Sequence, residues 1–193
     1  MAQEPVPVGF LDGSLGPEDA ISGNDWPVKD SIGEENALAT EISSAARALD
    51  AVPGLAAARD GDVAALEALL TSGWRPNTQD TKGCTALMWA AGAGHLDVCE
   101  ILVRHGADVN FSNKSGRTAL QWAARNAQLE ACEWLANRGA DVDSLAKDGV
   151  NIFHWAVWGG SVPVCKWALS MGVNPHAVNR WGCSAIHWAG AAG

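Results

Sequence analysis

A period of 33 residues runs through the sequence from about residue 51 onward. Four sets of residues keep this spacing: Gly83, Gly116, Gly149 and Gly182; Gly73, Gly106, Gly139 and Gly172; Trp89, Trp122, Trp155 and Trp188; and Cys99, Cys132 and Cys165. Equal intervals in several residue types are not expected by chance, and a fixed period of about 20–50 residues is typical of stacked repeat proteins. The sequence therefore predicts a line of similar units that stack on one another.

Each unit is predicted to hold two short helices. In the clearest unit, an alanine-rich segment at 86–93 follows Thr85, whose hydroxyl is expected to cap this helix by accepting a backbone N–H. A second segment at about 96–104 has apolar residues at helical spacing and ends before Gly106, which accepts the left-handed conformation at little cost. Because isolated helices shorter than about 12 residues are marginal in water, stability must come from neighbouring units that cover each other's apolar faces.

The repeated unit resembles the ankyrin repeat, whose consensus is close to D-x-x-G-x-T-P-L-H-x-A-A-x-x-G-H-x-x-V-x-x-L-L-x-x-G-A-D-V-N. The clearest unit matches this pattern at Asp80, Gly83, Thr85, Leu87, Ala90, Ala91, Gly94, His95, Leu102, Gly106, Ala107, Asp108, Val109 and Asn110. The third full unit is looser, with Asn151 for the threonine and Ala146 for the turn aspartate. The resemblance covers about residues 51–193. It implies an all-α ankyrin-repeat solenoid of stacked helix–turn–helix pairs with β-turn or hairpin tips, and a role in binding other proteins.

The chain is expected to divide into an acidic tail, a capping helix and a repeat domain. Residues 1–33 are rich in proline, glycine and acidic residues, which predicts disorder. Residues 34–50 place apolar residues on one helical face, which predicts a helix that caps the stack. Repeats are expected at about 51–77 (degenerate), 78–110, 111–143, 144–176 and 177–193 (partial).

The two end repeats depart from the pattern in different ways. In the first repeat, Gly54 replaces the core leucine, which predicts a weakness there. The last repeat lacks its second helix, which favours a fragment of a longer protein and predicts that Ile186 and Trp188 lie on an exposed end.

Charge is unevenly distributed along the chain. Residues 1–50 hold ten acidic and two basic residues, a net charge of −8, whereas residues 51–193 hold twelve acidic and eleven basic residues, a net charge of −1. The resemblance implies that turn tips and the outer ends of the first helices form an exposed, concave binding face, which here would be selectively basic. The residues predicted to bind a partner are Lys114, Arg117, Arg125, Lys147, Trp158, Arg180 and Trp181.

No catalytic, cofactor or metal-binding pattern stands out in the sequence. The three cysteines at repeat spacing are predicted to form a buried column, whereas Cys84 and Cys183 follow turn glycines and are expected near the surface. Five free thiols without a signal peptide or an apolar run of 18 residues favour an intracellular location, cytoplasmic or nuclear.

The leading hypothesis is a non-enzymatic scaffold or adaptor that binds another protein with an acidic segment. Tryptophan and arginine often dominate binding energy at interfaces, so Trp158 and Trp181 are expected to anchor the partner. The acidic tail could also fold back and compete with that partner. The alternative is a regulatory or substrate-recruiting ankyrin domain of a larger enzyme or adaptor truncated at residue 193. Nucleic acid is not expected as a partner because the repeat domain is not basic overall, and a membrane is not expected because the sequence shows no membrane-spanning run. No small-molecule partner is expected.

Overall fold

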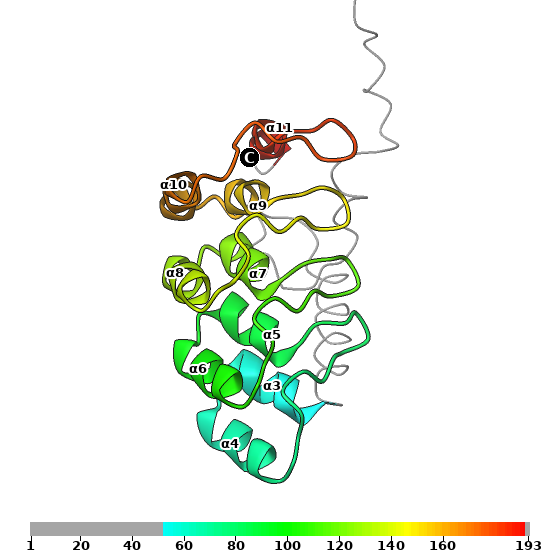
Figure 1. The fold of residues 1–193 in the computed structure, drawn as a ribbon, viewed down its shortest axis with the longest axis vertical. Helices are drawn as coiled ribbons and strands as arrows, with labels where there is room; N and C mark the ends of the chain where they lie inside the picture. The colour runs from blue at the N-terminus through cyan, green and yellow to red at the C-terminus, as the bar shows by residue number, and fades with distance from the viewer. Residues whose placement is uncertain (1–51, 192–193) are drawn as a thin grey trace, which may run out of the picture. The chain divides into compact units, whose positions relative to one another are not determined.

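A computed structural model describes residues 52–191, and within this range the fold consists of nine α-helices (Figure 1). They are α3 (Pro53–Asp60), α4 (Val63–Thr71), α5 (Ala86–Ala93), α6 (Leu96–Arg104), α7 (Ala119–Arg125), α8 (Leu129–Asn137), α9 (Ile152–Trp158), α10 (Val162–Ser170) and α11 (Ala185–Ala191). The helices predicted at 86–93 and 96–104 are confirmed, and so is the all-α repeat fold. The expected disorder of residues 1–33 and the expected capping helix at 34–50 lie outside the described residues.

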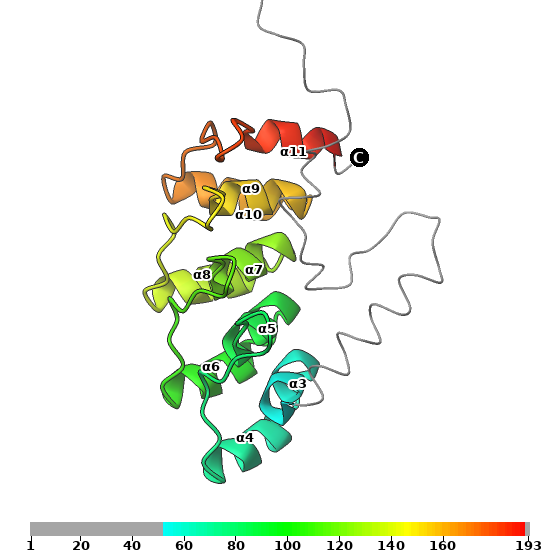
Figure 2. The ribbon, with the colours of Figure 1, turned by 90° about the vertical axis from the view of Figure 1, so that its right-hand side faces the viewer.

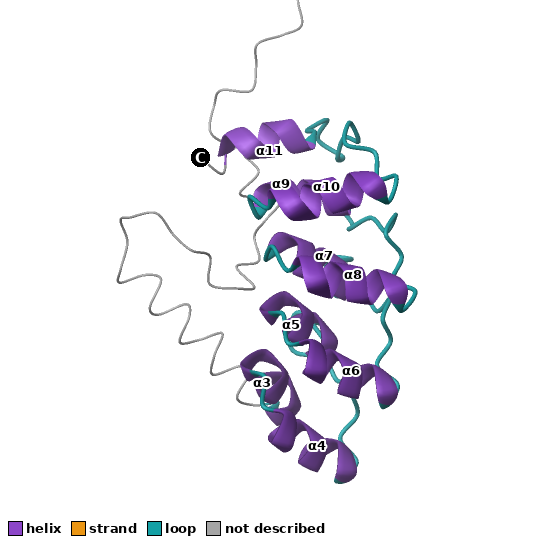
Figure 3. Ribbon diagram, turned by 90° about the vertical axis from the view of Figure 1, so that its left-hand side faces the viewer, coloured by secondary structure: helices purple, strands orange, loops and turns teal. Residues whose placement is uncertain are grey.

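The helices form two layers. The inner helices α3, α5, α7, α9 and α11 pack against one another in chain order, and α4, α6, α8 and α10 form the outer layer beside them (Figure 1). Views from the two sides show the layers stacked pair upon pair, without strands in the described range (Figures 2 and 3). Each pair therefore buries its apolar faces mainly against the next pair, as the short helices require.

Tryptophans of the inner helices form the centre of this core. Trp122, Trp155 and Trp188 are almost fully buried. The ring centroids of Trp89 and Trp122 lie 5.2 Å apart, and those of Trp155 and Trp188 lie 5.5 Å apart in an edge-on arrangement. Such aromatic pairs add to the stabilisation that burial alone provides. These tryptophans therefore join successive repeats through the inner layer.

The end of the stack is only partly as predicted. Ile186 on α11 is 72% exposed, as expected, but Trp188 is 1% exposed, so its predicted exposure is wrong. The reason is geometric: residues two apart on a helix face different directions, and the Trp188 ring turns back to pack edge-on against His154 and Trp155 of the preceding repeat.

Helix capping differs between repeats. Thr118 and Gln121 form a reciprocal capping box at the start of α7, and Asn151 caps α9 by accepting from the His154 backbone. Thr85 occupies the equivalent position before α5 but makes no side-chain capping bond, so that prediction is wrong. The reciprocal bond of a capping box is also absent there, because Met88 has no polar side chain to return it.

Gly54 leaves room for the side chain of Trp74, so it does not weaken the packing of the first repeat. A Cβ atom at Gly54 would lie 2.3 Å from atoms of the Trp74 indole ring. The indole therefore fills the volume that a leucine would occupy in the other repeats. The expectation of a poorly packed first repeat is corrected, because Trp74 folds back from the following loop onto α3.

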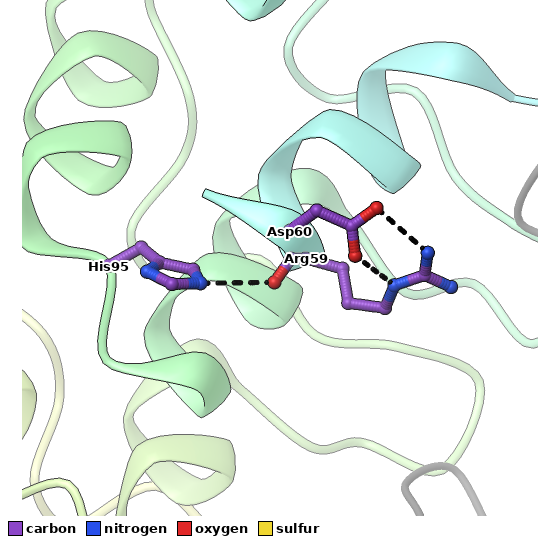
Figure 4. Close-up of polar contacts among 3 residues, drawn as sticks. All are labelled: Arg59, Asp60 and His95. Atoms are coloured by element: carbon purple, nitrogen blue, oxygen red, sulfur yellow. Dashed lines mark hydrogen bonds and ion pairs between the residues drawn. The ribbon is translucent and has the colours of Figure 1, made fainter. Parts of the chain in front are cut away.

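His95 joins the first two helix pairs. Its Nε2 atom lies 3.1 Å from the carbonyl oxygen of Arg59 at the end of α3, as Figure 4 shows. The ring is so close to Gly61 that a Cβ there would lie 2.8 Å from it, and Gly61 also has a positive φ of 73°. Beside this contact, the Arg59 guanidinium donates to Asp60 at 2.7 Å and lowers the pKa of that carboxyl (Figure 4).

The cysteines of the last two repeats are less buried than those of the earlier repeats. Cys99 and Cys132 are fully buried, as predicted, and burial raises the pKa of each thiol to about 12. Cys165 is only half-buried. The expected surface position of Cys84 is wrong, because its side chain is fully buried and its sulfur accepts a hydrogen bond from Asn113 of the next repeat at 3.3 Å. Cys183, which was also expected near the surface, is half-buried.

Ala127 has the backbone conformation of a glycine. It has a φ of 60°, while Gly61, Gly94 and Gly160 hold the equivalent positions with φ between 65° and 82°. Ala127→Gly is expected to raise the free energy of unfolding by about 1 kcal/mol, because a left-handed alanine costs about 1–2 kcal/mol, partly offset by the flexibility of glycine in the unfolded chain. Urea denaturation measures this change.

A matched glycine substitution inside a helix provides the control for Ala127. Ala136→Gly in α8 is expected to lower the free energy of unfolding by about 0.5–1 kcal/mol, because it adds the entropy cost without relieving strain. If both substitutions destabilise equally, the conformation at Ala127 carries no strain.

Candidate interaction surface

Four loops project beyond the inner helices, and we call them fingers: residues 79–85, 112–118, 145–151 and 178–184 (Figure 1). Each finger closes through the same backbone bonds. In the second finger, the Asn113 N–H donates to the Arg117 carbonyl at 2.9 Å and the Gly116 N–H donates to the Asn113 carbonyl at 2.8 Å. Gly116 has a positive φ of 75°, which explains why the turn position is glycine in all four fingers.

A side-chain acceptor holds three of the four turns. The Asn113 Oδ1 atom accepts from the backbone N–H groups of Ser115 and Arg117, both at 3.0 Å. Asp80 and Asn179 bond their own turns in the same way. Ala146 has no side-chain acceptor, so the third finger lacks this pair of bonds.

Restoring the acceptor in the third finger should stabilise the protein. Ala146→Asn is expected to raise the free energy of unfolding by about 1–2 kcal/mol, since each net hydrogen bond contributes about 1 kcal/mol and the equivalent Asn113 and Asn179 fit at 5% exposure. Thermal and urea denaturation measure the change. Ala146→Val, which adds bulk without an acceptor, should not stabilise; an equal gain from valine would contradict the explanation.

Direct backbone bonds join neighbouring fingers. The Lys114 N–H donates to the Lys82 carbonyl at 3.1 Å, the Lys147 N–H to the Ser115 carbonyl at 3.0 Å, and the Arg180 N–H to the Asp148 carbonyl at 2.9 Å. Lys114, Lys147 and Arg180 occupy one repeat position, 33 residues apart, and we call them the finger row. The bonds fix the backbone of each finger-row residue against the preceding finger.

The side chains of the finger row are exposed. The Lys114 Nζ donates to the Thr81 carbonyl at 2.7 Å. The Arg180 guanidinium lies 3.1 Å from the Asp148 carboxylate and 4.2 Å from the centre of the Trp181 ring. Trp181 is half-buried, so its ring supports Arg180 and also remains accessible in part. These four predicted site residues therefore lie where a partner could reach them.

Arg117 does not lie on the surface as predicted. It is 5% exposed, and its guanidinium stacks over the buried Trp155 ring of the next repeat at 4.5 Å. The position after the turn glycine points between repeats. Its equivalents Cys84 and Val150 are also buried. The apolar residues at those positions were the signal that could have predicted this.

Arg125 and Trp158 end the inner helices α7 and α9 at equivalent positions. Arg125 is 7% exposed, which corrects the prediction of an exposed contact residue. The next repeat closes on this site: a Cβ at Gly159 would lie only 2.3 Å from the Arg125 carbonyl oxygen. Trp158 is half-buried, with its ring centroid 6.0 Å from that of Trp188, and so presents only part of its ring.

Charge is segregated between the two sides of the stack. The fingers carry five basic residues and two acidic ones, Asp80 and Asp148. The outer helices α4, α6, α8 and α10 carry the opposite balance, five acidic and two basic residues. The Asp80 carboxylate accepts from backbone N–H groups, and Asp148 pairs with Arg180. Arg117 is buried, so four exposed basic residues, Lys82, Lys114, Lys147 and Arg180, remain on the finger side, although the whole repeat region is nearly neutral.

Within residues 52–191, no group of three or more histidine, cysteine, aspartate or glutamate side chains could hold a metal ion. None of the described helices has the length and apolar character needed to cross a membrane.

Stacked helix pairs with hairpin-like fingers define a class of solenoid repeat proteins. Residues 55–146 are ankyrin repeats: the family model of ankyrin repeats in three copies matches this range. A search of curated proteins found no match. Ankyrin repeats are generally non-catalytic modules for protein interaction.

Proposed function

We propose that this chain is a scaffold or adaptor that binds an acidic segment of a partner protein along its fingers. The observation that carries the proposal is the finger row, three exposed cations at one repeat position on a side where basic residues outnumber acidic ones. Electrostatic complementarity of this kind speeds association and selects partners more than it adds affinity.

Aromatic side chains next to the row would supply the apolar contacts. Trp181 supports Arg180, and Trp158 presents part of its ring at the end of α9. Half-buried tryptophans are preorganised by their packing, so little conformational entropy is lost when a partner covers them. The cations would therefore orient the partner, and the tryptophans would hold it.

Binding of a fluorescent acidic peptide to the full chain tests this proposal. The finger-row variant carries Lys114→Gln, Lys147→Gln and Arg180→Gln. We expect it to bind a glutamate-rich peptide roughly tenfold more weakly than the native chain, because three exposed ion pairs of about 0.2–1 kcal/mol each are lost. A glutamine-rich peptide should bind weakly to both proteins.

A control variant with the same change of charge separates site binding from general attraction. Arg75→Gln, Arg104→Gln and Lys166→Gln remove three exposed charges outside the fingers. This outer variant should bind like the native chain. Equal weakening of both variants would show that only net charge matters and would refute the finger side as the binding surface.

A further inference from the structure

We propose that the finger row binds the partner's acidic segment as an extended polyproline II chain with a carboxylate at every third residue. This inference rests on the function proposed above and specifies the partner that the same surface fits. It follows from the spacing of the cations, the aromatic ring beside them and the acid that already occupies one of them.

The cations stand on a regular support. Direct N–H to carbonyl bonds of 2.9–3.1 Å join each finger to the one before it, so the three backbone positions repeat with the stack. Packed helices lie about 8–10 Å apart, and the finger row therefore has a step of about 8–10 Å and a length of about 16–20 Å over two steps.

Three regular peptide conformations can be compared with this step. Polyproline II has three residues per turn and rises about 3.1 Å per residue, so every third side chain lies on one face with a step of about 9 Å. A β-strand repeats its face every two residues, a step of about 6.6 Å. Two turns of α-helix span about 10.8 Å.

The differences accumulate along the row. Over two steps, polyproline II advances about 19 Å, which lies within the 16–20 Å of the finger row. The strand advances about 13 Å, at least about 3 Å short of the row, and the helix about 22 Å, at least about 2 Å beyond it, so neither repeat stays in register with the three cations. Polyproline II is the conformation whose repeat matches that of the stack.

The end of the row carries an aromatic ring suited to such a chain. Polyproline II segments are recognised by aromatic surfaces that contact proline rings. Trp181 is half-buried and lies beneath Arg180, with the guanidinium 4.2 Å from its ring centre. A carboxylate bound by Arg180 would therefore bring its neighbouring residues close to this ring.

Asp148 already forms an ion pair with Arg180, the third cation of the finger row, in the absence of a partner. Its carboxylate lies 3.1 Å from the Arg180 guanidinium, so a partner carboxylate must compete with it. Lys114, in contrast, donates to the neutral Thr81 carbonyl. Removing the charge of Asp148 should therefore strengthen binding of the acidic segment at Arg180. Binding of the segment away from Arg180 would gain little from this change.

A set of three peptides of equal composition tests the register on the full chain. Each peptide holds three glutamates in a proline background, spaced by two, three or four residues, which corresponds to about 6, 9 or 12 Å in polyproline II. We expect the three-residue spacing to bind several-fold more tightly than the other two. Asp148→Asn should tighten binding of that peptide by roughly two- to fivefold, and the finger-row variant should remove its advantage.

The outcomes separate this inference from the proposed function. Equal affinity for all three spacings, lost in the finger-row variant, would overturn the register and leave the acidic binding surface intact. Equal affinity that survives in the finger-row variant would overturn both. A preference for the three-residue spacing that disappears in the finger-row variant and increases in Asp148→Asn supports both.

Discussion

Replacing Trp122 with alanine is expected to lower the free energy of unfolding by about 3–5 kcal/mol, enough to unfold much of the protein at moderate temperature. Trp122 is 2% exposed on α7, in the middle of the inner layer, and its ring centroid lies 5.2 Å from that of Trp89. Removal of the indole leaves a cavity between two repeats, which short helices cannot close without losing their mutual packing. Urea denaturation monitored by circular dichroism measures the loss.

Trp158→Ala is the matched control. Trp158 ends α9, is half-buried and lies at the edge of the Trp188 ring, so its truncation is expected to cost well under half as much stability. It should, however, weaken binding of the acidic peptide. If both variants melt alike, Trp158 belongs to the core and the proposed apolar contact is wrong.

Gly159→Ala is expected to destabilise the protein by about 3 kcal/mol, although alanine is the better helix former. Gly159 has an ordinary φ of −71°, so its backbone would accept alanine without strain. The new Cβ, however, would lie 2.3 Å from the Arg125 carbonyl oxygen and 3.2 Å from that of Ala124. Both atoms belong to backbone, so relief requires α7 and α9 to separate.

Substitution of the adjacent glycine separates the steric clash of an added Cβ from the strain of a left-handed backbone. Gly160 has a positive φ of 65° and no atom within 4 Å of an added Cβ. Gly160→Ala should therefore cost only the left-handed penalty of about 1–2 kcal/mol. Backbone propensity alone predicts that Gly160→Ala destabilises the protein more than Gly159→Ala. If Gly159→Ala proves the less destabilising of the two, the close contact between repeats is contradicted.

Most of the fold could be predicted because the repeat period reports it directly. The 33-residue spacing predicted stacked pairs of short helices, and the structure confirms them. Details that depend on a neighbouring repeat were less predictable. Thr85 has the residue type of a cap but makes no capping bond, and the space at Gly54 is filled by Trp74, twenty residues later in the chain.

The candidate site shows the same division. Lys114, Lys147 and Arg180 were predicted to be exposed, and they are, because their shared position lies at the tip of each finger. Arg117 and Arg125 were predicted to be exposed because the resemblance places them on the binding face, although both positions are covered by the following repeat. Charge indicates solvent exposure only where no neighbouring unit packs, which a single unit of sequence does not reveal.

Nuclear magnetic resonance mapping can locate an acidic protein segment bound to the finger side. The full chain, labelled with ¹⁵N, is titrated with the glutamate–proline peptide of three-residue spacing. We expect shift changes at the backbone amides of Lys114, Lys147 and Arg180 and at the Trp181 indole N–H, with α6, α8 and α10 unaffected. Changes centred on the outer helices, with the finger amides unmoved, would contradict this expectation.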